Sequence, residues 1–437
     1  MIGWIILMFV SLIVLLLAGY PVALTLGAIA MLFGTVFLGI EFFRLLPLNI
    51  WGVMTNFTLL AVPLFIFMGI ILDKSGIAED LLETMGALFG RIRGGLALSV
   101  IIVGALLAAT TGVVGATVVT MGIIALPTML KHKYSPQLAS GTIAASGTLG
   151  QIIPPSIILI LLGDVMGVPV GRLFMGAVIP GMLLVGLFCI YVLLLAWYRP
   201  QVAPALVREK QEHILSRVFF ILLPPLFLVI AVLGSIFFGI ASPTESAAVG
   251  ALGAIILAKL HNKLTLQNLR ETMQLTTRLT SMVFLILIGA TAFGLVFRGM
   301  GGDDIVLDLM TGLPGGVWGF LLISMLLIFI LGFFLDFLQI CFIVVPILTP
   351  IAKVLHIDPL WFAVLIAMNL QTSFLTPPFG FSLFYLKAVA PVTVRIKDIY
   401  EGIIPFVSLQ VIGIILLIVF PGIVVWLPNL MDRLQGF

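Results

Sequence analysis

The chain has 437 residues, of which 62% are hydrophobic and only 9% are charged. Soluble proteins carry roughly 25% charged residues, so this composition excludes a water-soluble enzyme and predicts a protein that lies mostly within a lipid bilayer. The formal net charge is only +3, and the Lys and Arg residues are spread over predicted membrane-flanking loops. That distribution excludes a nucleic-acid-binding protein.

Stretches with few charges predict ten membrane crossings, because a spanning helix needs about 20 mainly apolar residues. The first forty residues predict two helices, separated at Gly19-Tyr20-Pro21. Single crossings are expected within residues 45–72, 134–163, 173–198, 218–244, 245–258, 279–297, 359–386 and 402–431. Within this series, Ser242, Pro243 and Glu245 have the spacing of a capping box that begins a helix.

Two further apolar stretches, residues 94–130 and about 312–354, do not fit as single crossings. Each is too long for one spanning helix and too short for two, and the first is interrupted by the sequence TTGVVG at 110–115. The second contains an acidic residue, Asp336, near its middle. We therefore predict two re-entrant hairpins, whose tips must be buried in protein or line a cavity at mid-membrane depth.

An internal repeat supports the two hairpins. Displacing the chain by 223 positions places every proline of residues 126–156 on a proline of residues 349–379. The pairs are Pro127 with Pro350, Pro136 with Pro359, Pro154 with Pro377, and Pro155 with Pro378. We predict one all-α membrane domain over residues 1–437, with a first repeat at 56–165, scaffold helices and cytoplasmic linkers at 166–278, a second repeat at 279–390, and a last membrane helix at 402–431.

The charges near the helix ends predict that the repeats are inverted. Cytoplasmic loops carry an excess of Lys and Arg, and the first hairpin is flanked by Arg91, Arg93, Lys131 and Lys133. Three acidic residues, at 303, 304 and 308, precede the second hairpin, which is therefore expected to enter from the opposite side. Inverted repeats are typical of secondary transporters with a site near the midplane. This topology places both chain termini in the periplasm.

Each predicted hairpin is followed by a helix that two adjacent prolines interrupt, Pro154-Pro155 in one repeat and Pro377-Pro378 in the other. Proline removes a backbone donor and leaves upstream carbonyl groups without helical partners. Together with nearby hydroxyl groups, these carbonyls are suited to a hard cation such as sodium. The hydroxyl groups are those of Thr110, Thr111, Ser146, Thr148, Thr372, Ser373 and Thr376. The alternative is a kinked helix whose hydroxyls bond back to the preceding turn.

Asp336 is the most central ionisable residue, and an acidic group inside a membrane indicates function because burying its charge is costly. It is a candidate cation ligand or proton carrier, and the alternative is a helix cap. Neutral side chains that could bind substrate oxygens are Gln151, Ser156, Gln339 and Asn369, with Gln371 nearby. Neutral amides in a helix bundle also serve as contacts between helices.

Four segments together resemble a known family over essentially the whole chain. They are SGTLGQIIPPS at 146–156, GRLFMGAVIPG at 171–181, SPTESAAVGA at 242–251 and QTSFLTPPFG at 371–380. The chain resembles the large membrane subunit of tripartite ATP-independent periplasmic (TRAP) transporters. The resemblance implies a sodium-coupled importer of organic acid anions in the bacterial inner membrane, in which a domain holding both hairpins and both broken helices slides like an elevator against a scaffold.

The resemblance also implies partners and ion sites. The partners are a small four-helix membrane subunit and a periplasmic substrate-binding protein, in contact with membrane lipid. The first sodium site is implied at Thr110, Thr111, Gly112, Ser146, Gly147 and Thr148. The second is implied at Leu335, Asp336, Gln371, Thr372, Ser373 and Thr376.

One departure concerns the first hairpin tip, where many relatives have a run of serines and this chain has Thr111-Gly112-Val113-Val114. Valine side chains cannot bind a cation, so a site there would use threonine oxygens and backbone carbonyls. The tip resembles the subgroup associated with 2-oxo acids, hydroxy acids and aromatic acids. Two alternatives stay open: a stand-alone carboxylate symporter that needs no binding protein, and a membrane enzyme using Asp336. The enzyme is disfavoured because no second catalytic group is evident.

Overall fold

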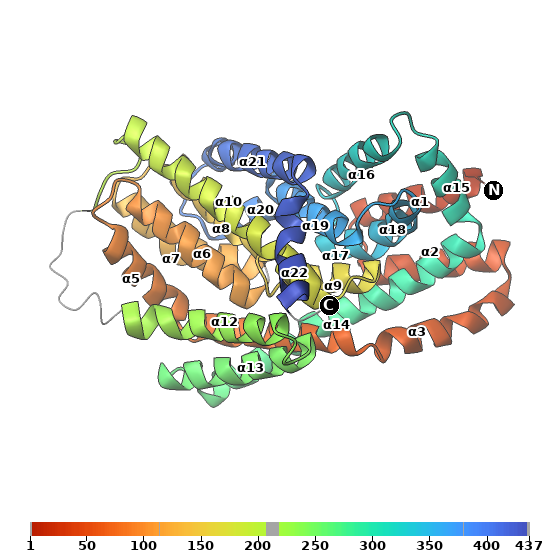
Figure 1. The fold of residues 1–437 in the computed structure, drawn as a ribbon, viewed down its shortest axis with the longest axis horizontal. Coiled ribbons are helices and arrows are strands. Elements are labelled where there is room, and N and C mark those ends of the chain that lie inside the picture. Colours follow the sequence, from red (N-terminus) through yellow and green to blue (C-terminus); the bar gives the residue numbers. More distant parts are fainter. Residues whose placement is uncertain (1, 113, 207–217, 379, 435–437) are drawn as a thin grey trace.

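A computed structural model describes residues 2–112, 114–206, 218–378 and 380–434, and this part of the chain is helical, without strands (Figure 1). The first half contains α1 (Ile2–Leu17), α2 (Val22–Phe37), α3 (Leu46–Met54), α4 (Ala61–Lys74), α5 (Ile77–Phe89), α6 (Gly95–Thr111), α7 (Val114–Lys131), α8 (Pro136–Thr148), α9 (Ile157–Met166) and α10 (Val170–Tyr198). Short helical turns η1 (Ile40–Leu45), η2 (Phe57–Leu60) and η3 (Leu149–Gln151) lie between them.

The second half repeats this order. It contains α12 (Leu223–Phe237), α13 (Pro243–Leu260), α14 (Leu266–Gly299), α15 (Gly302–Thr311), α16 (Val317–Leu331), α17 (Phe337–Gln339), α18 (Val345–Val354), α19 (Pro359–Leu375), α20 (Phe381–Val389), α21 (Ile396–Val419) and α22 (Gly422–Leu434). Turns η4 (Val218–Leu222) and η5 (Ile340–Val344) precede α12 and α18. The capping box predicted at Ser242 is confirmed at the start of α13.

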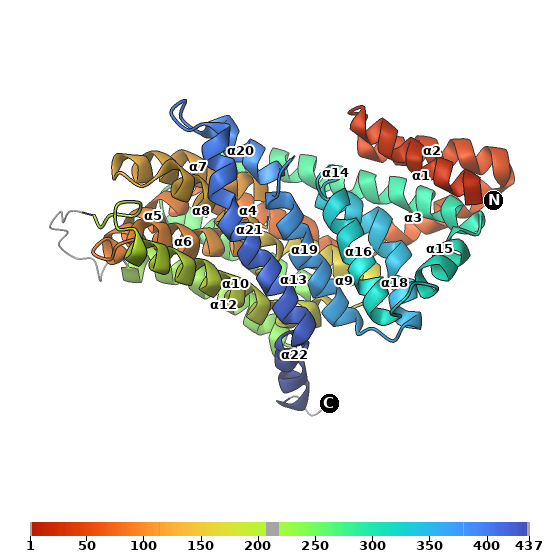
Figure 2. The ribbon, with the colours of Figure 1, turned by 90° about the horizontal axis from the view of Figure 1, so that it is seen from above.

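The repeat extends beyond the two predicted segments, 56–165 and 279–390. Helices outside these segments also match one another when the chain is displaced by 223 residues. The displacement relates α1 to α12, α2 to α13, α4 to the second half of α14, α5 to α15, and α10 to α21. Packing follows the same relation, since α2 lies along α14 and α13 lies along α4. Only α22 lacks a counterpart among the described helices, and it projects from the bundle at the C-terminal end (Figure 2).

Both predicted hairpins are pairs of helices. The first consists of α6 and α7, and the second of α16 with α17, η5 and α18. The two hairpins lie in different halves of the molecule in both ribbon views (Figures 1 and 2). Eight described helices are long and apolar enough to cross a membrane, and two of these, Val114–Lys131 and Phe337–Val354, belong to the hairpins. The total of ten crossings stays a prediction.

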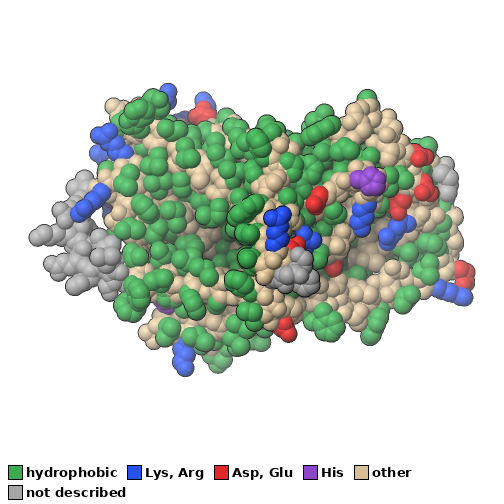
Figure 3. All heavy atoms as spheres, in the orientation of Figure 1, with side chains coloured by type: hydrophobic (Ala, Val, Ile, Leu, Met, Phe, Trp, Pro, Cys, Tyr) green, Lys and Arg blue, Asp and Glu red, His purple; other side chains and the backbone are tan. Residues whose placement is uncertain are grey.

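The helices after the hairpins are the most deeply buried parts of the chain. Every residue of α8 from Leu138 to Thr148 is buried, and so is every residue of α19 from Leu360 to Leu375. Large apolar side chains are instead exposed on helices such as α1, α2, α12 and α14, and the face shown in Figure 3 is mostly hydrophobic. The outside therefore suits lipid, while the interrupted helices are enclosed by protein, as irregular backbone within a membrane requires.

Three details differ from the sequence-based expectation. The single last helix expected over 402–431 is two helices, α21 and α22, because Pro421 lacks an N–H group and disfavours helical geometry at Phe420. The crossing expected in 45–72 is divided near Asn56, whose side chain accepts a hydrogen bond from the N–H of Thr58. The charge-rich segment before residue 279 is helical, so α14 begins at Leu266.

Candidate functional site

The first broken helix is pressed closely against the first hairpin. A Cβ atom at Gly104 of α6 would lie 2.6 Å from the Cβ of Ser146 on α8, and one at Gly147 would collide with Val118 of α7. Only glycine, which has no side chain beyond a hydrogen atom, therefore fits at these two positions. The tip residue Gly112 has φ +60° and ends α6, and its N–H donates to Ala108 O at 3.0 Å. The hairpin thus holds the predicted residues Gly112, Ser146 and Gly147 close to the break.

The second hairpin makes an equivalent contact with α19. A Cβ atom at Gly332, at the end of α16, would collide with the hydroxyl group of Ser373. The amide of Asn369 donates to Met325 O of α16 at 2.7 Å. The Nδ2 of Asn369 thus joins two helices, and the role of Asn369 in substrate binding stays a prediction.

Both predicted helix breaks are confirmed. Helix α8 ends at Thr148 and α9 begins at Ile157, while α19 ends at Leu375 and α20 begins at Phe381. Between them lie Pro154-Pro155 and Pro377-Pro378, each with a cis peptide bond. At each break the C-terminal end of one helix and the N-terminal end of the next lie within the protein. The first end carries a partial negative charge and the second a partial positive charge, because of the helix dipoles.

The hydroxyl groups of the predicted sodium sites bond back to the preceding turn, which is the alternative that the sequence left open. The distances to the carbonyl oxygens are 2.9 Å for Thr110, 3.1 Å for Ser146, 2.8 Å for Thr148, 2.9 Å for Thr372, 2.9 Å for Ser373 and 2.7 Å for Thr376. Each hydroxyl donates its hydrogen in these bonds, so lone pairs on its oxygen are left for a cation. The side chain of Thr111 lies outside the described part of the chain.

Asp336 begins the second arm of the second hairpin. Its Oδ1 accepts a hydrogen bond from the N–H of Phe337 at 2.8 Å, which confirms a capping role. Leu335 beside it is buried and donates through its N–H to Leu331 O at 2.8 Å. No basic side chain of the described residues forms an ion pair with Asp336. The cap uses one carboxylate oxygen and leaves the other for a cation.

Four glutamines have buried side-chain amide atoms without a partner in the described structure. Gln151 and Gln371 are fully buried, and neither their side-chain oxygens nor their nitrogens have a partner. The Oε1 atoms of Gln339 and Gln410 are also unpaired. An unsatisfied buried polar group costs about 1–3 kcal/mol, so these amides point to a ligand that completes their hydrogen bonds or coordinates their oxygens. Ser156, in contrast, donates to Gln151 O at 2.9 Å.

Sequence reasoning missed Gln410. It lies on α21, which the sequence predicted only as part of the last membrane helix, and it is fully buried. The available signal was an amide side chain within an otherwise apolar stretch, residues 409–420.

Two inverted hairpins, each packed on a broken helix that carries unpaired polar groups, define the fold of a secondary transporter. The comparison of structures agrees on the fold: the Alcanivorax borkumensis YdaH transporter matches with a TM-score of 0.66 and 16% identity, over 94% of this chain and 98% of that one.

Comparisons of sequence identify the family. Residues 9–423 match the family "Tripartite ATP-independent periplasmic transporter, DctM component". The chain is 32% identical to the sialic acid TRAP transporter large permease protein SiaM of Vibrio cholerae, over 95% of this chain and 96% of that protein. It is 30% identical to the C4-dicarboxylate TRAP transporter large permease protein DctM of Pseudomonas aeruginosa, over 88% and 90%. The chain belongs to the DctM family of TRAP transporter large permease proteins.

Proposed function

We propose that this chain is the large permease subunit of a sodium-coupled, binding-protein-dependent importer of organic acid anions, such as 2-oxo acids or dicarboxylates. The observation that carries the proposal is the pair of helix breaks, each beside a hairpin and each supplied with buried oxygen atoms. Hydroxyl, carbonyl, amide and carboxylate oxygens suit a hard cation. The two sodium sites are the sets given above, with Gln151, Ser156, Gln339 and Asn369 as the substrate-facing candidates.

The amide groups support an anionic substrate. Unpaired Nε2 atoms of Gln151 and Gln371 are donors without acceptors, and a carboxylate accepts such bonds. Relatives are named for sialic acid and for C4-dicarboxylates, both of which are carboxylate anions. The substrate class of this chain is therefore proposed as carboxylate anions of small organic acids.

An elevator motion would break two hydrogen bonds that join the first hairpin and its broken helix to the proposed scaffold. The hydroxyl of Thr120 on α7 donates to Asp73 Oδ1 of α4 at 2.9 Å, and Asn56 bonds to Asp164 of α9. Lys74 and Glu271 form an ion pair between α4 and α14, within the proposed scaffold. In this proposal α4 and α14 stay fixed. The bonds of Thr120 with Asp73 and of Asn56 with Asp164 break when the domain of both hairpins and both broken helices slides.

The proposed partners are a small membrane subunit and a periplasmic binding protein, and the proposed location is the bacterial inner membrane with both termini in the periplasm. Exposed apolar side chains on α1, α2 and α12 leave broad surface for lipid or a membrane partner. A stand-alone symporter is the competing function.

Substrate uptake into proteoliposomes distinguishes the two functions. The vesicles contain this chain with or without the small subunit, and candidate binding proteins are added outside with a panel of 2-oxo acids, dicarboxylates and sialic acid. The proposal predicts uptake only when all three proteins are present. Uptake by this chain alone would establish the stand-alone symporter.

A further inference from the structure

Gln410 occupies a position where an apolar side chain would be expected. It lies within α21, its side chain is fully buried, and its Oε1 has no partner among the described residues. The corresponding position in the first repeat, 223 residues earlier on α10, is Leu187. The first repeat thus has a leucine at this position, while the second repeat has a buried amide whose oxygen has no partner among the described residues.

Gln410 faces the end of α8, where the first broken helix stops. Its Nε2 lies 3.5 Å from the hydroxyl oxygen of Thr148, which is long for an N–H···O hydrogen bond. Thr148 already donates its hydrogen to Ala145 O at 2.8 Å. The Thr148 oxygen therefore presents lone pairs toward an amide that contacts it only weakly.

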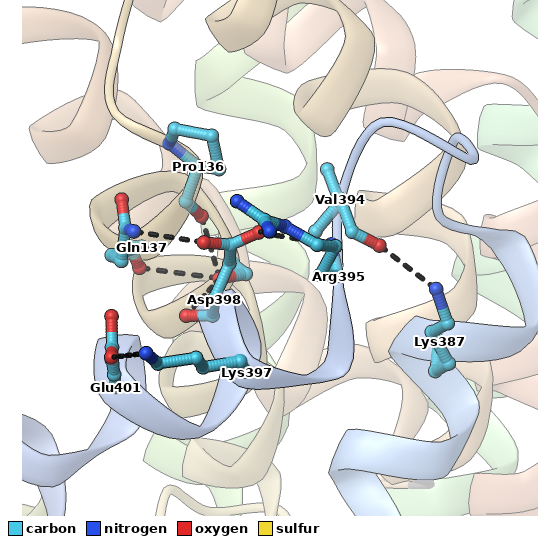
Figure 4. A network of polar contacts seen from close by, with 9 residues as sticks. Pro136, Gln137, Lys387, Val394, Arg395, Lys397, Asp398 and Glu401 are labelled. Atoms are coloured by element: carbon cyan, nitrogen blue, oxygen red, sulfur yellow. Dashed lines mark hydrogen bonds and ion pairs between the residues drawn. The ribbon is translucent and has the colours of Figure 1, made fainter.

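The register that places Gln410 beside Thr148 is fixed at the other end of the two helices. Near the start of α8 and α21, Gln137 Nε2 donates to Asp398 Oδ1 at 2.9 Å (Figure 4). The Asp398 carboxylate also accepts the N–H of Arg395 at 3.0 Å, so it caps α21. From this clamp, α8 and α21 run side by side in the same direction, for roughly 17 Å of helix, to Thr148 and Gln410.

Glycines keep these two helices in close contact along the way. A Cβ atom at Gly141 of α8 would collide with the backbone of Gly402 on α21. The pair cannot separate or slip without losing this contact and the clamp, so Gln410 is held opposite Thr148.

We propose that the side-chain oxygen of Gln410 is a further ligand of the first sodium site, supplied by α21 to the cation bound beside Thr148. A half-turn of the amide exchanges Oε1 and Nε2, which differ little in shape. Two oxygens that bind one hard cation at about 2.4 Å and at right angles lie roughly 3.4 Å apart, close to the 3.5 Å seen here. A ligand on α21 makes the first site depend on both repeats.

This inference rests on the proposed sodium coupling, and Gln410→Leu tests it. The variant copies Leu187, preserves approximate volume and removes the oxygen. We expect the sodium concentration for half-maximal uptake to rise about tenfold, and the sodium-induced increase of Tm to shrink, while Tm in potassium alone stays at or above the wild-type value. Gln410→Glu keeps oxygen ligands at the same reach and should remain within about threefold of wild type.

Gln137→Leu is the matched control, because Gln137 holds the helices together far from the site. The contact between Gly141 and Gly402 still holds the two helices in register in this variant, so Gln137→Leu should lower Tm in potassium and leave the sodium half-saturation within about threefold of wild type. If Gln410 merely joins α8 to α21, Gln410→Leu will behave like Gln137→Leu, and the inference is overturned. If uptake and Tm of the wild-type protein do not depend on sodium, both the proposed coupling and the role of Gln410 are overturned. If the wild-type protein depends on sodium and Gln410→Leu has the same sodium dependence, only the role of Gln410 is overturned.

Discussion

Asp336 shows how one side chain can serve structure and ion binding together. Its Oδ1 caps the second arm of the second hairpin, and asparagine is about as good a cap as aspartate. Asp336→Asn should therefore fold normally but lose the charge that attracts a cation. We expect the sodium half-saturation of uptake to rise at least tenfold, measured by sodium titration, while Asp304→Asn on exposed α15 stays at the wild-type value. Unchanged sodium dependence in Asp336→Asn would exclude it as a ligand.

Residue types near the site could be predicted, but their individual bonds could not. The sequence indicated the hydroxyl groups and Asp336 but left their hydrogen bonds open. The structure shows that hydroxyls such as that of Thr148 bond back to the preceding turn and that Asp336 caps a helix. Gln410 was missed because an amide in an apolar helix is commonly a contact between helices. Only the packing of α21 on α8 reveals that its oxygen is unpaired and faces Thr148.

At the scale of helices, the proline pairs are the features on which the proposed sites depend most. Pro154→Ala or Pro377→Ala restores a backbone N–H at a helix break and favours a continuous helix. We expect uptake to fall at least tenfold in each variant with normal membrane insertion, measured as initial rates in proteoliposomes. Pro405→Ala is the control, because Pro405 lies inside the continuous helix α21. Wild-type rates in both break variants would contradict the proposed sites.

The repeat of proline positions was the strongest sequence signal for these helices, since it predicted both breaks and placed a hairpin before each. Boundaries elsewhere depended on weaker signals. The turn at Asn56 and the helical start of α14 at Leu266 are stabilised by local caps within segments where charge and hydropathy alone give no boundary. Helix α21 ends at Val419 because of a single proline, Pro421, which lies within a continuous apolar run and so gave no clear boundary.

For the whole molecule, the elevator proposal predicts that some contacts break during transport and others do not. Asp73→Cys with Thr120→Cys joins α4 to the first hairpin where the present side chains are hydrogen-bonded. In a background lacking Cys189 and Cys341, oxidation of this pair should abolish uptake, and a reductant should restore it. Gln137→Cys with Asp398→Cys joins α8 to α21, which pack directly on each other at Gly141 and Gly402 and are proposed to move together, so its oxidation should leave most uptake intact. Full activity of the oxidised first pair would contradict the sliding motion.

Sodium coupling is the central claim of this account, and accumulation of substrate against its gradient tests it most directly. Proteoliposomes containing the large and small subunits, with the binding protein outside, receive an inward sodium gradient, equal sodium on both sides, or a proton gradient without sodium. We predict that internal substrate exceeds the external concentration only under the inward sodium gradient. Accumulation driven by the proton gradient in the absence of sodium would contradict the claim.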